Sequence, residues 1–153
     1  MKKVIIGFCL IVISFGTKAQ FAVNYYYDGN TIGLSTNPEK PHWFEFRVNT
    51  VSYIFSNWHF SDRGITQAYY CFRVVTDQKA TLYTGIGAGV PLLSDRIDWA
   101  SVNIPVGLQV NPFHQLPGLF LTAEYNPMVE VTDDFEITNT LSVGFRYVFG
   151  KKK

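Results

Sequence analysis

The stretch from Val102 to Val110, VNIPVGLQV, alternates strictly between apolar side chains and side chains that are polar, very small or proline. Successive residues of a β-strand point to opposite faces of a sheet, so this pattern predicts a strand with one apolar and one polar face. The same alternation recurs at 82–90, 119–126 and 141–149. The sequence pattern therefore predicts a β-sheet. The fold class of the protein depends on which of the two faces of this sheet meets water.

Segments with the residue pattern of β-strands follow one another along the chain. No segment between them shows a convincing repeat of apolar residues with helical spacing. Turn-forming residues such as Asp28-Gly29-Asn30 and Ser61-Asp62-Arg63-Gly64 separate them. The eight expected strands cover residues 21–27, 31–36, 42–55, 66–76, 79–90, 99–111, 117–128 and 139–149. Two places disturb the pattern. Pro105 predicts a bulge or a local gap in the sixth strand, and a change of parity predicts a bulge near Asn49–Thr50 in the third.

The polar face consists of glycine, serine, threonine, asparagine and glutamine, with single charges. A face in water usually carries long charged side chains, above all lysine, yet no lysine lies between Lys79 and Lys151. Small side chains suit the crowded interior of an eight-stranded barrel. We therefore expect an all-β, eight-stranded antiparallel up-and-down transmembrane β-barrel, with its apolar face toward lipid and its backbone bonds satisfied by closure. The alternative is a soluble sandwich or calycin-like barrel with an apolar core.

The N-terminus has the pattern of a secretory signal. Two lysines precede an apolar run from Val4 to Phe15, and small residues stand at Thr17 and Ala19, which predicts cleavage after Ala19. The run is shorter than the about 20 residues of a membrane helix, and a retained anchor helix is the alternative. The expected organisation is a signal peptide at 1–19, a barrel at 20–150 and a basic tail at 151–153.

The charge balance and the cysteine count exclude several classes. Three of the 13 lysines and arginines lie in the leader, which leaves 10 basic against 12 acidic residues. This balance gives no electrostatic basis for binding nucleic acid. Cys71 becomes the sole cysteine, so no internal disulfide is expected. The three histidines are scattered, and the sequence predicts no cofactor and no metal site built on them.

Several segments resemble a known family: TKAQ at the end of the leader, YTGIGAGVPL, IPVGLQVNPF, LFLTAEYNP and the closing LSVGFRYVF. They are similar to the small outer-membrane β-barrel proteins of Gram-negative bacteria, particularly the short Bacteroidota type. The resemblance implies an outer-membrane location, both termini in the periplasm, and recognition of the last aromatic residue, here Phe149, by the barrel-insertion machinery. Gly150 and three lysines follow Phe149, which departs from the family pattern. The implied outer loops are 28–30, 56–65, 91–98 and 129–138, and the implied periplasmic turns are 37–41, 77–78 and 112–116.

Five charged residues fall on the polar parity of the expected strands: Glu45, Arg47, Arg73, Glu124 and Arg146. Neighbouring strands predict two cross-strand pairs, Glu124 with Arg146 and Glu45 with Arg73. We expect them to neutralise one another in a filled lumen and to fix strand register; a gated proton or ion path is the alternative. Tyr69, Tyr83 and Phe120 share this parity and would help to fill the lumen, so an open pore is not expected.

The segment NWHFSDRG places His59 two residues before Ser61. A serine activated by a histidine is the arrangement used for acyl transfer. The H-x-S-[ND] order resembles the motif of outer-membrane lipid A deacylases, which would make His59 the base and Ser61 the nucleophile. That family carries a glutamate about a strand's length further on, and here none lies between Glu45 and Glu124. A polar turn is the simpler interpretation.

The last expected outer loop is acidic. It contains Glu130, Asp133, Asp134 and Glu136. Such carboxylates can hold Ca²⁺ and bridge to lipopolysaccharide phosphates, although the absence of EF-hand spacing favours a solvated loop. The aromatic residues expected at the membrane interfaces are Trp43, Trp58, Trp99, Tyr125 and Tyr147.

Taken together, the patterns predict a small outer-membrane barrel with a filled lumen and a structural, envelope or surface-interaction role. The expected partners are outer-membrane lipids, lipopolysaccharide and the barrel-insertion machinery, with an extracellular ligand or protein partner of unspecified kind. Two alternatives remain: a lipid A deacylase-like hydrolase that uses His59 and Ser61, and a soluble calycin-like ligand-binding barrel.

Overall fold

A computed structural model describes residues 20–27, 30–49, 65–77, 79–91, 100–113, 115–131 and 135–150. The strands in these residues are β1 (Phe21–Tyr26), β2 (Thr31–Thr36), β3 (His42–Asn49), β4 (Thr66–Thr76), β5 (Ala80–Val90), β6 (Ala100–Asn103), β7 (Val106–Val110), β8 (Leu119–Val131) and β9 (Phe135–Val148). This part of the chain contains no helix long and apolar enough to cross a membrane.

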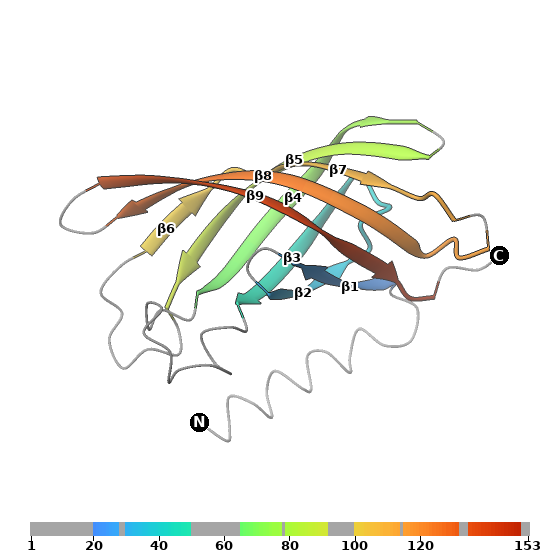
Figure 1. Cartoon of the computed structure of the whole chain (residues 1–153), viewed down its shortest axis with the longest axis horizontal. Helices are drawn as coiled ribbons and strands as arrows, with labels where there is room; N and C mark the ends of the chain where they lie inside the picture. The colour runs from blue at the N-terminus through green and yellow to red at the C-terminus, as the bar shows by residue number, and fades with distance from the viewer. Residues whose placement is uncertain are drawn as a thin grey trace, which may run out of the picture.

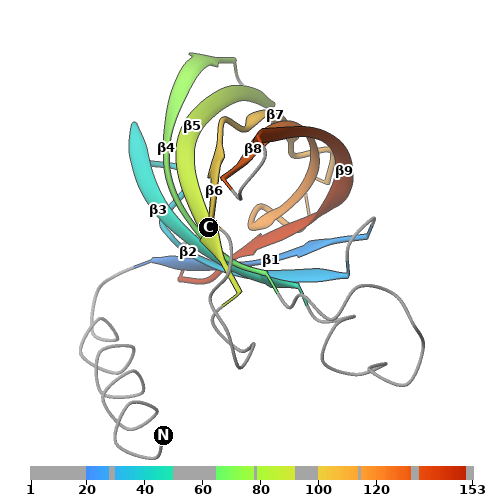
Figure 2. The ribbon, with the colours of Figure 1, turned by 90° about the vertical axis from the view of Figure 1, so that its left-hand side faces the viewer.

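The strands close into one barrel, and Figure 2 shows the wall curving around a central axis. Strands β1 to β5 pair in chain order, and β9 pairs with both β8 and β1. Strands β6 and β7 both lie between β5 and β8, so together they form one interrupted strand. All these pairings are antiparallel, which confirms the expected closed barrel of eight antiparallel strands.

The expected local gap at Pro105 is confirmed, and it is a gap without a bulge. The pairing register with β5 and with β8 is the same on both sides of the break. The Gly85 N–H donates to the Pro105 carbonyl at 3.1 Å, and the Ile104 N–H donates to the Pro127 carbonyl at 3.0 Å. Neither proline has an N–H to return. The interrupted strand β6–β7 therefore lacks one backbone hydrogen bond to β5 and one to β8, although its pairing register with both strands is unchanged.

The last hairpin is longer than the sequence predicts. Strand β8 continues to Val131 and β9 begins at Phe135, so most of the expected outer loop at 129–138 is paired strand. The alternation of side chains continues through this segment, which is the physical reason for the extension.

The pairing of β4 with β5 has a register shift between Arg73 and Val75. The bulge predicted near Asn49–Thr50 falls at the edge of residues 50–64, which lie outside the described ranges.

The apolar face of the sheet points outward. From Val102 to Leu108 the apolar side chains are 41–53% exposed, whereas Asn103 and Gln109 are 0% and 2% exposed. The same alternation of buried and exposed residues runs along β5, β8 and most of β9. A water-soluble sheet shows the opposite arrangement, with its apolar face in the core. The expected outward orientation of the apolar face is thus confirmed.

Glycines on the inward face make room for large side chains from neighbouring strands. A Cβ atom on Gly107 would lie 2.3 Å from the Tyr83 ring, and a Cβ atom on Gly87 would lie 2.3 Å from the Tyr69 ring. Both tyrosines are buried and pair directly with these glycines across adjacent strands. The glycine-rich alternation of β5 therefore reflects a barrel interior filled by aromatic rings.

The two ends of the barrel differ. Both described chain ends meet at one of them, here called the terminal end, where the Gln20 side-chain amide donates to the Gly150 carbonyl at 3.2 Å. The opposite end, here called the loop end, carries the β1–β2 and β8–β9 connections. Strands β1 and β2 have six residues each, whereas β8 and β9 have 13 and 14. The long β8–β9 hairpin therefore extends past the short β1–β2 hairpin at the loop end (Figure 1).

Candidate functional site

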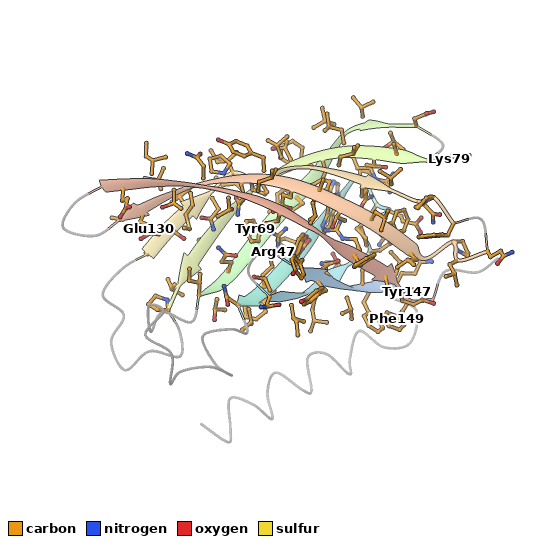
Figure 3. All side chains as sticks on the ribbon, in the orientation of Figure 1. Arg47, Tyr69, Lys79, Glu130, Tyr147 and Phe149 are labelled. Atoms are coloured by element: carbon orange, nitrogen blue, oxygen red, sulfur yellow. The ribbon has the colours of Figure 1, made fainter. Side chains whose placement is uncertain are left out.

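A network of four buried charges crosses the lumen. Arg47 on β3 holds Glu124 on β8 through two hydrogen bonds, from Nη1 at 2.5 Å and from Nη2 at 2.8 Å. Its Nε donates to Glu45 Oε1 at 2.7 Å. The other oxygen of Glu45 accepts a bond of 2.7 Å from Arg146 on β9. The result is a continuous, electrically neutral chain of two carboxylates and two guanidinium groups, with Arg47 between the walls of the barrel (Figure 3).

Both carboxylates have further partners. The Tyr26 hydroxyl donates to Glu45 Oε1 at 2.8 Å, and the Tyr83 hydroxyl donates to Glu124 Oε2 at 2.8 Å. The indole N–H of Trp43 lies 3.5 Å from Glu45 Oε2. A buried carboxylate is costly unless it is paired and hydrogen-bonded, and both conditions are met here.

Arg146 is fully buried and all three of its nitrogens donate. Its Nε donates to Asn24 Oδ1 at 2.7 Å and its Nη1 to Gln109 Oε1 at 2.7 Å. The guanidinium carbon lies 5.3 Å from the centre of the Tyr83 ring, within the range of cation–π attraction. This side chain thereby ties β9 to β1, β3 and β7 at one level of the barrel.

Arg47 lies between two aromatic rings. Its guanidinium carbon is 4.3 Å from the ring centre of Tyr26 and 4.3 Å from that of Tyr69. Planar guanidinium groups stack well on aromatic faces, so these rings hold the group that bridges Glu45 and Glu124. Charges and rings together fill the cross-section of the lumen at this level.

The expected pair of Glu124 with Arg146 is replaced by the pair of Glu124 with Arg47. Arg146 lies opposite Phe120 on β8, and not opposite Glu124. A long arginine side chain from β3 reaches across the narrow lumen to Glu124 instead. The inward positions were predicted from parity, whereas the partners depend on register and on reach across the barrel.

The expected pair of Glu45 with Arg73 is also replaced. Glu45 lies opposite Tyr69 on β4 and binds Arg47 and Arg146. Arg73 lies further toward the terminal end, where its Nη2 contacts the Pro38 carbonyl at 3.4 Å. It therefore does not join the buried network.

Trp43 does not belong to an interfacial girdle. Its side chain is 1% exposed and packs edge-on against Tyr83, with ring centres 5.4 Å apart. It shares the inward parity of Glu45 and Arg47, which explains its position. Tyr125 and Tyr147 do point outward, as expected. Trp58 and Trp99 lie outside the described residues.

The speculative sites fall mainly on segments that the structure does not describe. His59 and Ser61 lie in one such segment, and Asp133 and Asp134 lie in another. Glu130 and Glu136 are described and face each other across the β8–β9 hairpin. Among the described residues, no cluster of three or more His, Cys, Asp or Glu side chains could hold a metal ion.

Sequence reasoning missed three polar members of the network, Asn24, Tyr26 and Gln109. Each occupies an inward position of its strand, opposite a glycine or a threonine on a neighbouring strand. The same parity that identified the four charges therefore also marks these three residues. What parity does not show is which of them contacts which charge.

The reactivity of the Cys71 thiol can be used to test whether the lumen is closed. It is buried among Trp43, Tyr69 and Tyr83. In a chain with Cys9 replaced by serine, we expect Cys71 to react with a maleimide at least about a hundredfold more slowly when folded than when unfolded, because labelling requires opening of the barrel. A Lys79→Cys variant that also carries Cys71→Ala is the exposed control and should label quickly in both states. Equal rates for folded Cys71 and the control would contradict a filled lumen.

The chain has no match among protein-family models and none among curated proteins.

Proposed function

We propose that the protein is a small outer-membrane β-barrel whose filled lumen serves as a rigid internal brace, with a structural, envelope or surface-interaction role. The observation that carries this proposal is the inverted distribution of side chains: charges and amides lie inside, and apolar side chains lie outside. The expected partners are outer-membrane lipids, lipopolysaccharide and the barrel-insertion machinery.

The apolar surface supports a location in a bilayer. Exposed large apolar side chains occur on every strand, so they form a belt around the barrel. Soluble monomers rarely expose contiguous apolar patches larger than a few hundred Å². Strands β4 and β5 have 11 residues each, which matches the about 9–11 residues of a tilted membrane-spanning strand.

The terminal end carries a cluster of aromatic side chains. Phe149 stacks on Phe21 with ring centres 4.7 Å apart, and its other neighbour Tyr147 is also at 4.7 Å. Figure 3 shows Tyr147 and Phe149 at this end and Glu130 at the other. Aromatic girdles of this kind mark the membrane interfaces of outer-membrane barrels. The cluster supports a membrane interface at the terminal end. The resemblance to small outer-membrane barrels is what assigns this end to the periplasm and the final strand to the insertion machinery.

Cell fractionation tests the proposal. In cells that express the chain, we expect the protein in the outer-membrane fraction, with an electrophoretic mobility that changes on boiling because a closed barrel resists unfolding by detergent. A soluble protein whose mobility does not change on boiling would contradict the proposal and favour a soluble ligand-binding barrel.

The filled lumen predicts a membrane without conductance. Reconstituted into planar bilayers, the folded protein should give no stable current steps, because the Arg47–Glu124 bridge and its flanking rings occupy the lumen. The control is a double Arg47→Ala, Glu124→Ala variant, which lacks the bridge and its side-chain volume. We expect small current steps from this variant. Stable current steps from the unaltered protein would contradict a filled lumen.

A further inference from the structure

Strand β9 has an unpaired edge beyond the end of β1. The pairing of β1 with β9 ends at Gly144, and the last bond on this side joins the Tyr27 N–H to the Val143 carbonyl. On its other side, β9 stays paired with β8 toward the loop end as far as Phe135. Among the described residues, no strand pairs with residues 136–141 on the side of β1. These residues are here called the free edge of β9.

The direction of the backbone groups at this edge follows from the antiparallel pairing. In such a strand, residues of one parity direct both N–H and C=O to one neighbour, and residues of the other parity direct them to the other neighbour. The Val143 carbonyl and the Phe149 N–H bond to the β1 side, so the odd-numbered residues of β9 point that way. Ile137, Asn139 and Leu141 therefore direct their N–H and C=O groups to the free edge, where the structure describes no partner.

The free edge lacks the features that usually protect an exposed strand. Natural edge strands are blunted by proline, lysine, a bulge or a short length. The segment EITNTL at 136–141 contains neither proline nor lysine, and its pairing with β8 has no register shift. Isoleucine and threonine favour strands. The free edge is thus a regular template to which a further strand can bind through backbone hydrogen bonds.

Apolar side chains lie along the outer side of the free edge. Ile137 and Leu141 are 70% and 72% exposed, and Tyr27 at the end of β1 is 73% exposed. These are the highest values among the large apolar side chains that the structure describes. Side chains that lie opposite each other on neighbouring strands make contact, so an added strand would place every second side chain beside this surface. Apolar residues at alternate positions of the added strand fit it.

Negative charge lies at the loop end of the free edge. Glu136 is exposed and pairs with Glu130 on β8, and like charges directly opposite each other destabilise a sheet. The chain from Glu130 to Glu136 contains two further aspartates and neither lysine nor arginine. A lysine or arginine at the end of an added strand would offset this repulsion. Charge complementarity therefore favours a basic partner.

A second copy of the chain does not fit the free edge. Two such edges pair antiparallel only if the two barrels point in opposite directions, whereas the proposed function gives every copy the same direction in the membrane. They pair in parallel only if the apolar outer face of one barrel continues the polar inner face of the other. The segment 136–141 also has no basic side chain to pair with Glu136 of a second copy. The partner is therefore a different chain.

We propose that the free edge of β9 is a docking site for an extended segment of another protein. This segment adds to the sheet as an antiparallel strand that matches residues 136–141 in length and lies in line with β1. Its apolar side chains alternate and lie beside Ile137 and Leu141, and its C-terminal end carries lysine or arginine beside Glu136. The proposal rests on the proposed function, because the common direction of all copies in the membrane excludes a second copy from the edge. It names a kind of partner for the surface-interaction role.

Nuclear magnetic resonance of the folded protein in dodecylphosphocholine micelles tests the docking site. The probe is a synthetic peptide of three valine–threonine repeats followed by two lysines, with both ends blocked. Without peptide, we expect the amides of Ile137, Asn139 and Leu141 to exchange with solvent at least about tenfold faster than those of the two threonines between them, which point toward β8. With peptide, we expect saturable shifts of the three odd-numbered amides and slower exchange at each.

Two variants at Asn139 give the matched comparison. Asn139→Pro removes the N–H group that points to the free edge and leaves the bonds to β8 in place. We expect it to weaken peptide binding by about tenfold or more. Asn139→Ala is the control, because it loses the same side-chain bond to the Tyr125 hydroxyl but keeps the backbone N–H. It should leave the affinity unchanged.

Two charge reversals test the basic end of the partner, and they decide the question if Asn139→Pro does not fold. Glu136→Lys should weaken binding of the lysine peptide by about threefold or more, because repulsion replaces attraction. Glu39→Lys changes the net charge by the same amount in the β2–β3 connection at the terminal end, and it should leave the affinity unchanged.

Four results would overturn the proposal. The first is slow exchange of the three edge amides without peptide, which would show an edge that is already covered. The second is no saturable shift, and the third is unchanged affinity in folded Asn139→Pro or in Glu136→Lys. The fourth is protection of the edge amides that rises with protein concentration alone, which would indicate a second copy.

The failure of the docking site can be distinguished from the failure of the proposed function. A chain that stays soluble in cell fractionation contradicts the proposed function itself. A membrane-bound barrel that does not bind the peptide contradicts only the docking site.

Discussion

Replacing Glu45 by leucine should lower the free energy of unfolding by about 3–5 kcal/mol, the usual cost of removing one partner from a buried ion pair. Glu45 accepts hydrogen bonds from Arg47, Arg146 and Tyr26, so its loss leaves two buried guanidinium groups without a shared carboxylate. The change in unfolding free energy can be measured by urea titration of the barrel in lipid vesicles, with β-structure followed by circular dichroism.

Glu136→Leu provides the control for Glu45→Leu. Glu136 is exposed at the loop end of β9, and surface substitutions of this kind usually change stability by less than about 0.5 kcal/mol. Similar small effects at both positions would contradict a network that braces the lumen. A large loss at Glu45 alone would support it.

Gly144→Ala should destabilise the closure of the barrel by about 3 kcal/mol, at the upper end of the usual cost of overpacking. A Cβ atom at this position would lie 2.0 Å from the carbonyl oxygen of Tyr25 on β1, so the backbone of one strand has to move. Because β1 and β9 are the first and last strands, this displacement falls on the pairing that closes the barrel. The same urea titration measures the loss.

Gly33→Ala is the matched control for Gly144→Ala. Gly33 also faces inward, but a Cβ atom there would lie 3.3 Å from its nearest neighbours, the side chains of Asn24 and Glu45. Side chains can yield by a few tenths of an ångström, so a cost below about 1 kcal/mol is expected. Equal effects at the two glycines would show that the close approach of β1 to β9 does not limit stability.

The inward and outward faces could be predicted from the sequence because β-strand parity is strictly local. Alternation placed Glu45, Arg47, Glu124 and Arg146 on one face of the sheet and Val102 on the other, and the structure has the first face inside and the second outside. The absence of lysine from the polar face then indicated which side is the lumen. These inferences need only the identity of neighbouring residues in the chain.

The partners inside the lumen could not be predicted, because they depend on register and on distances across the barrel. Arg47 and Glu124 come from strands that are not adjacent, and no pattern in the sequence relates them. Trp43 was assigned to the interface from a compositional tendency of tryptophan, although its parity placed it inside. Parity is the better guide where the two disagree, since it follows from backbone geometry.

At the loop end, β9 continues beyond the end of β1 because the two strands have unequal lengths, 14 and six residues. Boundaries of strands are difficult to predict from a single sequence, and the alternation from Val129 onward was interpreted as loop. The extension to Val131 and Phe135 makes β8 and β9 the longest strands of the barrel. That β9 extends beyond the end of β1 therefore became visible only from the pairing of the strands.

The central claim, that the apolar outer face contacts lipid, can be tested by fluorescence quenching in vesicles whose acyl chains carry bromine. In the first variant, the three natural tryptophans are replaced by phenylalanine, and Leu108→Trp introduces a single tryptophan on the outward face. A second chain retains only Trp43, which lies in the lumen. We predict strong quenching of the first and much weaker quenching of the second. An unquenched tryptophan at position 108, or equal quenching of both, would contradict a barrel that turns its apolar face to lipid.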